Sequence, residues 1–219
     1  PIMNTVIFDM DGVLVDSEPI ILRAAAKALA MCGIDADRVD FRRFIGTGEE
    51  NFITAPGKIY QKTDAEIQMM LSEMYALYEH DLPALCVYPH AAETVCALHD
   101  AGFCLGLVSS SGKNKLLATL KAAKIPSSCF SVILSGSDVT KRKPDPEPYR
   151  TAAHRLGKAP SDCLVIEDAL SGIAAAKGAG MHCAAIPNSF SETALTDAGA
   201  DLIIHDLNEI LPLMTEGRL

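Results

Sequence analysis

Along most of the chain, short runs of apolar residues alternate with segments whose apolar residues recur at helical spacing. The short runs are typical of buried strands, and the recurring spacing is typical of helices that bury one face. Their alternation predicts an α/β fold with a doubly wound parallel sheet covered by helices on both faces. The predicted strands cover residues 3–8, 103–109, 131–135, 163–167, 183–186 and 201–204. The predicted helices of this part cover residues 91–101, 113–123, 146–156 and 170–179.

The segment between residues 17 and 82 lacks this alternation, and its pattern is helical throughout. The apolar face of its first helix, which Ser17 can cap, consists of Ile21, Leu22, Ala25, Leu29 and Cys32. The second helix covers residues 64–78, and the residues expected in its core include Met69, Met70 and Met74. A helical block inserted directly after the first strand predicts an all-α cap domain of residues 17–82 on a core domain of residues 1–16 and 83–219.

Composition and charge narrow the class of protein. The chain has 219 residues, of which 49% are hydrophobic, so it can bury a substantial core. No apolar stretch approaches the roughly 20 residues of a membrane span, and the first residues lack a secretory signal, so we expect a cytoplasmic protein. The net charge of −9 argues against a nucleic-acid partner, and no obligate protein partner is predicted. The seven cysteines include no Cys-x-x-Cys pair, so neither a disulfide framework nor structural zinc is expected.

Two aspartates follow the first predicted strand, in the sequence Phe8-Asp9-Met10-Asp11-Gly12. Ligands of a doubly wound sheet bind at the carboxyl ends of its strands. Two carboxylates at this spacing can divide the chemistry, because one can bind a metal ion and attack a substrate while the other transfers a proton. The same short sequence also occurs in ordinary turns and calcium loops, but residues 13–15 supply no calcium ligand.

Polar residues also follow the second strand of the core. Ser109 ends that strand, and the following residues lead into a helix whose first backbone amides lack helical partners. Ser109 is therefore a candidate ligand of a phosphoryl oxygen. Ser110 or Ser111 is expected to cap the helix.

A lysine and two further acids complete the candidate chemistry. Lys143 belongs to the densest basic cluster of the chain, and Pro144 and Pro146 stiffen its loop, so its ammonium group could neutralise a phosphoryl group. Glu167 and Asp168 follow a strongly apolar strand, where acids are unfavourable unless a cation or hydrogen-bond donors meet them. Magnesium suits such a site, since it prefers carboxylate and carbonyl oxygens.

Four segments, FDMDGVLVDSE, LVSSS, KRKPDPEPY and VIEDALSGIAAAKGAG, resemble in this order the four motifs of the haloacid dehalogenase superfamily. The helical insert resembles the small α-helical cap of beta-phosphoglucomutases and related sugar-phosphate phosphatases. This resemblance implies a Rossmann-like catalytic core and a Mg²⁺-dependent phosphatase that forms an aspartyl phosphate. The implied substrate is a small phosphorylated metabolite, namely the phosphate of a sugar, a polyol or a carboxylic acid.

The resemblance also implies roles for individual residues. Asp9 is the implied nucleophile and Asp11 the acid and base, with Ser109 and Lys143 as further catalytic residues. The implied substrate-binding residues are Gly12, Ser109, Ser110 and Lys143. The implied Mg²⁺ ligands are the Asp9 carboxylate, the Asp11 carbonyl, the Asp168 carboxylate and, through water, Glu167.

Two other functions fit the same segments. A beta-phosphoglucomutase carries a cap histidine and a cap arginine, but the corresponding positions here are Ile21 and, when Gly46 is aligned, Glu49. Their identity favours hydrolysis over a mutase reaction. A non-catalytic binding protein is the second alternative, because a fold alone does not establish an activity. Such a protein would have no reason to keep the proton donor Asp11.

Overall fold

The computed structural model describes residues 3–45 and 48–216, and Gly46, on which the assignment of Glu49 rests, lies outside these ranges. The chain divides into two compact units, Pro1–Asp16 with Cys86–Leu219, and Ser17–Leu85. None of the helices within the described ranges is long and apolar enough to cross a membrane.

A six-stranded sheet forms the centre of the first unit. Its strands are β1 Thr5–Phe8, β4 Cys104–Val108, β5 Val132–Leu134, β6 Cys163–Glu167, β7 His182–Ala185 and β8 Leu202–Ile203. The strand order is β5-β4-β1-β6-β7-β8, and every neighbouring pair is parallel. The predicted α/β class is therefore confirmed. Each predicted strand is present, although β5 and β8 are shorter than the apolar runs that contain them.

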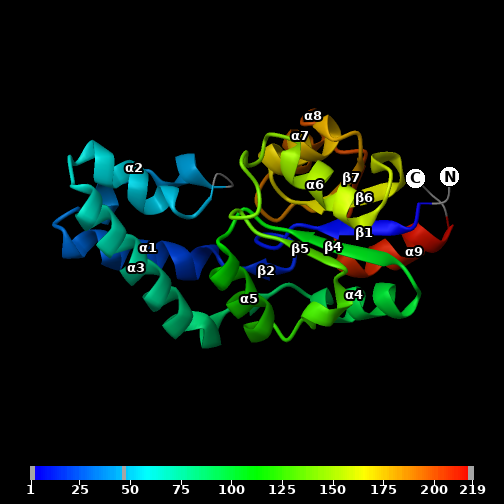
Figure 1. Ribbon diagram of the computed structural model, residues 1–219, viewed down its shortest axis with the longest axis horizontal. Helices are drawn as coiled ribbons and strands as arrows, with labels where there is room; N and C mark the ends of the chain where they lie inside the picture. Colours follow the sequence, from blue (N-terminus) through cyan, green and yellow to red (C-terminus); the bar gives the residue numbers. More distant parts are fainter. Residues whose placement is uncertain (1–2, 46–47, 217–219) are drawn as a thin grey trace. The chain divides into compact units, whose positions relative to one another are not determined.

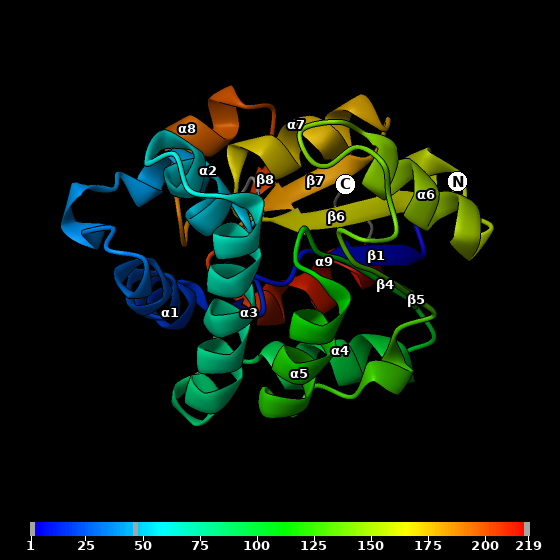
Figure 2. The same cartoon turned by 60° about the vertical axis from the view of Figure 1, so that its left-hand side comes forward.

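Helices cover both faces of this sheet (Figures 1 and 2). On one face lie α4 Ala91–Asp100, α5 Lys113–Ala122 and α9 Ile210–Glu216. On the other face lie α6 Glu147–Leu156, α7 Leu170–Gly178 and α8 Glu192–Asp197. The sequence pattern did not predict α8 and α9, because they are too short to show a clear helical period.

The central strands are apolar along their whole length because both of their faces are covered. All four residues of β1 and all five residues of β6 are buried. Ile7 and Val165 share one core cluster with Tyr149 and Ala152 of α6. The sheet thus provides a rigid base for the residues that follow its strands.

A second, two-stranded sheet was not predicted. Strands β2 Val15–Asp16 and β3 Cys86–Val87 pair in antiparallel fashion at the two points where the first unit joins the helical one. Strands of two residues are too short to show the alternating pattern from which strands are predicted.

Among the described residues of the second unit, the α-helices are α1 Glu18–Met31, α2 Asn51–Ile59 and α3 Asp64–Asp81. Helix α3 begins with a capping box, in which the Thr63 side chain accepts a bond from the Glu66 amide and the Glu66 carboxylate accepts one from the Thr63 amide. Met70 and Met74 are buried in the core of this unit, whereas Met69 is 46% exposed. The prediction for Met69 was wrong, since adjacent helical residues point about 100° apart.

Short 3₁₀ helices occur in both units. They are η1 Ala36–Arg38, η2 Phe41–Phe44, η3 Leu82–Ala84, η4 Ser127–Cys129, η5 Pro160–Asp162 and η6 Leu207–Glu209. All seven cysteines are free thiols, as the sequence predicted.

Candidate active site

Three adjacent strands of the main sheet end beside one another. Asp9 follows β1 and Ser109 follows β4. Glu167 is the last residue of β6, and Asp168 follows it. Strand β1 lies between β4 and β6, so the chain fills one side of the sheet with β4 and β5 before it crosses to the other side with β6. This reversal is a topological switch point, where ligands bind in doubly wound sheets.

Lys143 lies between two carboxylates at this edge of the sheet. Its Nζ atom donates to Asp9 Oδ1 at 2.7 Å and to Glu167 Oε1 at 2.7 Å, and also to the Val108 carbonyl at 3.2 Å. The Tyr149 hydroxyl donates to the same Glu167 oxygen at 2.7 Å. Lys143 is only 7% exposed, so these ion pairs lie in a medium that screens charge weakly.

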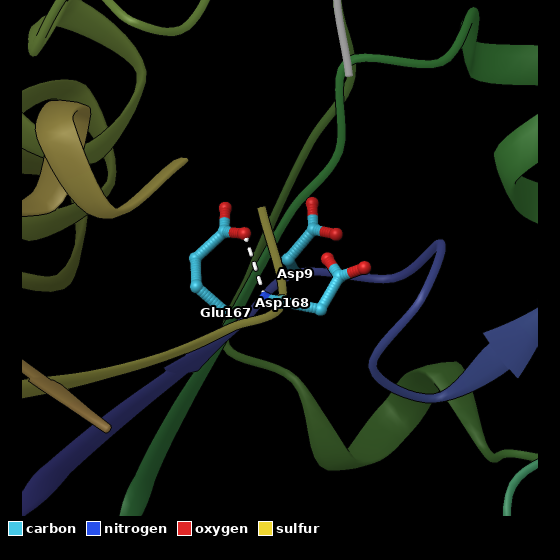
Figure 3. Close-up of side chains that lie close together, drawn as sticks. All are labelled: Asp9, Glu167 and Asp168. Carbon is cyan, nitrogen blue, oxygen red and sulfur yellow. Dashed lines mark hydrogen bonds between the residues drawn. The ribbon is translucent and has the colours of Figure 1, made fainter. Parts of the chain in front are cut away.

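Asp9, Glu167 and Asp168 form a buried cluster of carboxylates in which one oxygen of each lies within 4.8 Å of the others (Figure 3). The other Glu167 oxygen accepts the backbone amides of Asp168, at 3.1 Å, and Ala169, at 3.2 Å. The Ser189 hydroxyl donates to Asp168 Oδ2. Backbone and side-chain donors therefore hold Glu167 and Asp168 in fixed orientations.

The electrostatics of this cluster show a shortage of positive charge. Burial raises the pKa of Asp9 to about 7; Lys143 opposes this increase, while Glu167 and Asp11 add to it. Burial also raises the pKa of Asp168 well above its usual value, with contributions from Glu167 and Asp9. Although burial alone lowers the pKa of Lys143, the carboxylates of Asp9 and Glu167 raise it above the usual value, so the ammonium group stays charged.

Asp11 is held by a separate set of donors. Its Oδ2 atom accepts the Ser111 hydroxyl at 2.9 Å and the Ser109 hydroxyl at 3.4 Å. Its Oδ1 atom accepts the Lys115 ammonium group at 3.0 Å. The structure therefore joins Asp11 and Ser109, two of the predicted site residues. Ser110 is half-buried and is not among the residues that these contacts join.

The sequence analysis missed the roles of Ser111 and Lys115. A helix-capping role was expected of Ser110 or Ser111, but the N-cap residue of α5 is Gly112, so that expectation was wrong. The position of Lys115 could have indicated a buried contact, because this lysine shares the buried face of α5 with Leu116, Thr119 and Leu120. A charged residue on an apolar helix face requires a buried partner.

Gly12 allows the turn after β1 to approach β6. Its φ of +91° is a conformation that favours glycine, and a Cβ atom at this position would overlap the Asp168 carboxylate. The Asn188 side chain donates to the Gly12 carbonyl at 2.8 Å. Asn188 and Ser189, which also escaped the sequence analysis, both belong to the loop after β7. The sequence feature that could have indicated these two residues is their position beyond the carboxyl end of a core strand.

Residues 6–186 match the family model described as haloacid dehalogenase-like hydrolase. The chain belongs to this family. Its four motif segments meet at one edge of the sheet, and the resemblance seen in the sequence is confirmed.

Proteins similar to this haloacid dehalogenase-like hydrolase include both short enzymes and a much longer protein. The chloroplastic protein Suppressor of Quenching 1 of Arabidopsis thaliana is 34% identical over 211 residues, which cover 95% of this chain but only 20% of that protein. The validoxylamine A 7'-phosphate phosphatase of Streptomyces hygroscopicus subsp. limoneus is 30% identical, with coverage of 93% of this chain and 94% of that enzyme.

A solved structure agrees with this assignment to the haloacid dehalogenase-like hydrolases. The crystal structure of CbbY from Rhodobacter sphaeroides, in complex with phosphate, superposes with a TM-score of 0.82 at 26% identity. The superposition covers 95% of this chain and 96% of CbbY.

The role of Gly12 can be separated from ordinary backbone strain. Gly12→Ala should lower the free energy of unfolding by about 1–3 kcal/mol because alanine rarely adopts this φ, and it should also displace the Asp168 carboxylate. Gly102→Ala is the matched control, since Gly102 has a φ of +86° but no atom within 4 Å of the place that an added methyl group would occupy. Urea denaturation and phosphatase assays would compare the two variants. Because only an added methyl group at residue 12 would displace Asp168, Gly12→Ala should have the lower phosphatase activity. Equal activities of the two variants would contradict this effect on Asp168.

Proposed function

We propose that this chain hydrolyses a small phosphorylated metabolite with the help of Mg²⁺, through an aspartyl phosphate formed on Asp9. It is a phosphatase-type hydrolase by its family and by relatives such as the validoxylamine phosphate phosphatase. The observation that carries the finer proposal is the 2.7 Å contact between Lys143 Nζ and Asp9 Oδ1 at the switch point of the sheet. A buried ammonium group beside a strand-end carboxylate can neutralise the charge of a phosphoryl group that meets that carboxylate.

The charge balance of the site supports a divalent cation. Four carboxylates from the ends of β1 and β6 lie with two lysine ammonium groups, which leaves two negative charges in excess when all are ionised. One Mg²⁺ ion would balance this excess, and we assign the Asp9 and Asp168 carboxylates and the Asp11 carbonyl as its ligands. When bound, Mg²⁺ supplies positive charge to the phosphoryl oxygens.

Glu167 differs from the other acids of the site in its partners. Lys143 and Tyr149 occupy one of its carboxylate oxygens, and two backbone amides occupy the other. Its negative charge therefore serves to orient Lys143, and we propose that any contribution to metal binding passes through water.

In the proposed reaction, an Asp9 oxygen forms a bond to phosphorus while the bond from phosphorus to the leaving oxygen breaks. Asp11 enters this step in its protonated form and donates that proton to the departing oxygen. A water molecule then attacks phosphorus and gives its proton to Asp11, and the bond between Asp9 and phosphorus breaks. Lys143 neutralises charge in both steps, and Ser109 and Ser110 contribute donors to the phosphoryl oxygens. The sequence analysis also assigned Gly12 to substrate binding, but the Gly12 amide donates to the Val15 carbonyl at 2.8 Å.

A mutase is the second candidate, because it shares the first half of this reaction. In the helical unit, Ile21 is 3% exposed and packs in the core, and the Tyr75 hydroxyl donates to the Glu49 carboxylate at 3.2 Å. Neither position offers a histidine or an arginine for a second phosphate. These contacts support hydrolysis, while the role of the helical unit as a substrate-selecting cap and the cytoplasmic location stay predictions.

The nucleophile assignment is tested by Asp9→Asn. Turnover should fall at least about 1,000-fold because the amide cannot attack phosphorus, whereas circular dichroism should show an unchanged fold. Asp100→Asn is the matched control, because its carboxylate is 81% exposed on α4. Phosphate release at the wild-type rate by folded Asp9→Asn would refute the assignment.

Metal binding should stabilise the protein in a pH-dependent way. Since the pKa of Asp9 is raised to about 7 in the folded state, stability without metal should decline as pH rises from 4 through 7 and the buried carboxylate ionises. Mg²⁺ should offset this loss, so the increase in melting temperature on adding Mg²⁺ should be larger at pH 8 than at pH 5. Differential scanning fluorimetry measures both increases, with EDTA as the metal-free reference. The same increase at both pH values would count against carboxylate ligands.

Hydrolase and mutase differ in their products. With beta-glucose 1-phosphate, Mg²⁺ and a trace of glucose 1,6-bisphosphate, the protein should release inorganic phosphate or leave the sugar unchanged. Glucose 6-phosphate should not accumulate in a coupled dehydrogenase assay. Full conversion to glucose 6-phosphate without phosphate release would establish a mutase and leave the roles of Asp9 and Asp11 intact.

A further inference from the structure

Lys115 is a buried lysine that the proposed reaction does not yet use. Its side chain is 2% exposed and extends from the first turn of α5. An ammonium group in such a position is unfavourable unless ion pairs and hydrogen bonds compensate for its lost hydration. Its Nζ atom lies 3.0 Å from Asp11 Oδ1 and 2.9 Å from Ser111 Oγ.

The contacts of Lys115 continue around the Asp11 carboxylate. Ser111 Oγ accepts a bond from Lys115 and donates to Asp11 Oδ2 at 2.9 Å, so a closed ring joins the three side chains. Because the two oxygens of the carboxylate have different donors, the group cannot rotate without losing at least one charged hydrogen bond. The Asp11 side chain is nevertheless 32% exposed and can reach a bound molecule.

We propose that Lys115 is a positioning residue for proton transfer, which holds the Asp11 carboxylate, together with Ser111, in the orientation that faces the departing oxygen. This inference rests on the proposed role of Asp11. Lys115 acts through Asp11 and does not touch the substrate, since its ammonium group is enclosed.

The two buried lysines of the site thereby serve different carboxylates. Lys143 contacts Asp9, which attacks phosphorus, and Lys115 contacts Asp11, which moves the proton. Removal of Lys115 should therefore impair the protonation of the leaving group more than the attack by Asp9.

The test compares two substrates that differ in their need for an acid. Glycerol 2-phosphate releases an alkoxide that requires a proton, whereas p-nitrophenyl phosphate releases an acidic phenol that departs without one. For Lys115→Met, kcat/KM with glycerol 2-phosphate should fall by about 10- to 100-fold, which corresponds to the loss of one hydrogen bond to a charged group. With p-nitrophenyl phosphate, kcat/KM should fall by less than about threefold. The value of kcat/KM reports the first phosphoryl transfer and excludes the later step with water.

Three further variants make the result decisive. Lys121→Met removes an exposed lysine of the same helix and should leave both values unchanged. Ser111→Ala should give the same selective loss at about 3- to 10-fold, and it carries the test if Lys115→Met fails to fold in circular dichroism. Asp11→Asn should show the largest selective loss.

The outcomes separate this inference from the proposed function. Equal losses on both substrates in folded Lys115→Met, or in Ser111→Ala if the first variant is unfolded, would overturn the positioning role. If Asp11→Asn itself shows no preference between the substrates, the acid role of Asp11 fails, and the inference fails with it. If only Asp11→Asn is selective, the proposed function stands and Lys115 is a structural residue.

Discussion

The ion pair of Lys143 with Asp9 and Glu167 is the interaction on which the rest of the site depends. It joins the ends of β1 and β6 to the loop before α6, with both carboxylate contacts at 2.7 Å. Without its two carboxylates Lys143 would be a buried charge without a counter-charge, which is strongly destabilising. Both contacts form because the neighbouring strands β1 and β6 end side by side, so that Asp9 and Glu167 can reach the same ammonium group. The ion pair also places a fixed positive charge beside the carboxylate that we propose as nucleophile.

Close approach at the switch point requires glycine. The turn after β1 passes so near to β6 that the space of a Cβ atom at Gly12 is taken by the Asp168 carboxylate. Gly172 of α7 has the same relation to the Glu167 carboxylate. The acids can thus be buried next to backbone, where the amides of residues 168 and 169 donate to Glu167 and the Ser189 hydroxyl donates to Asp168.

The two lysines divide the site into parts with different chemistry. Lys143 favours ionisation of the group that must attack, while Lys115 and Ser111 enclose the carboxylate that we propose to move a proton. The carboxylates of Asp9 and Asp11 are only two positions apart in sequence, yet they point to different partners. An i, i+2 spacing in an irregular turn makes this separation possible, because neither residue is bound to the geometry of a helix.

The sequence by itself determined the elements of the fold and the kind of chemistry. Apolar runs and helical periods are local, so they identified six strands and most helices, and the acids after the first and fourth core strands were visible as polar residues next to buried ones. Only the tertiary structure decided which strands are neighbours, and with that which side chains meet. The bond from Lys115 to Asp11 spans 104 positions and follows from β4 lying next to β1. No local pattern contains that information, because it arises from the packing of the whole sheet. The β2–β3 pair was missed for a different reason, because strands of two residues are too short to show an alternating pattern.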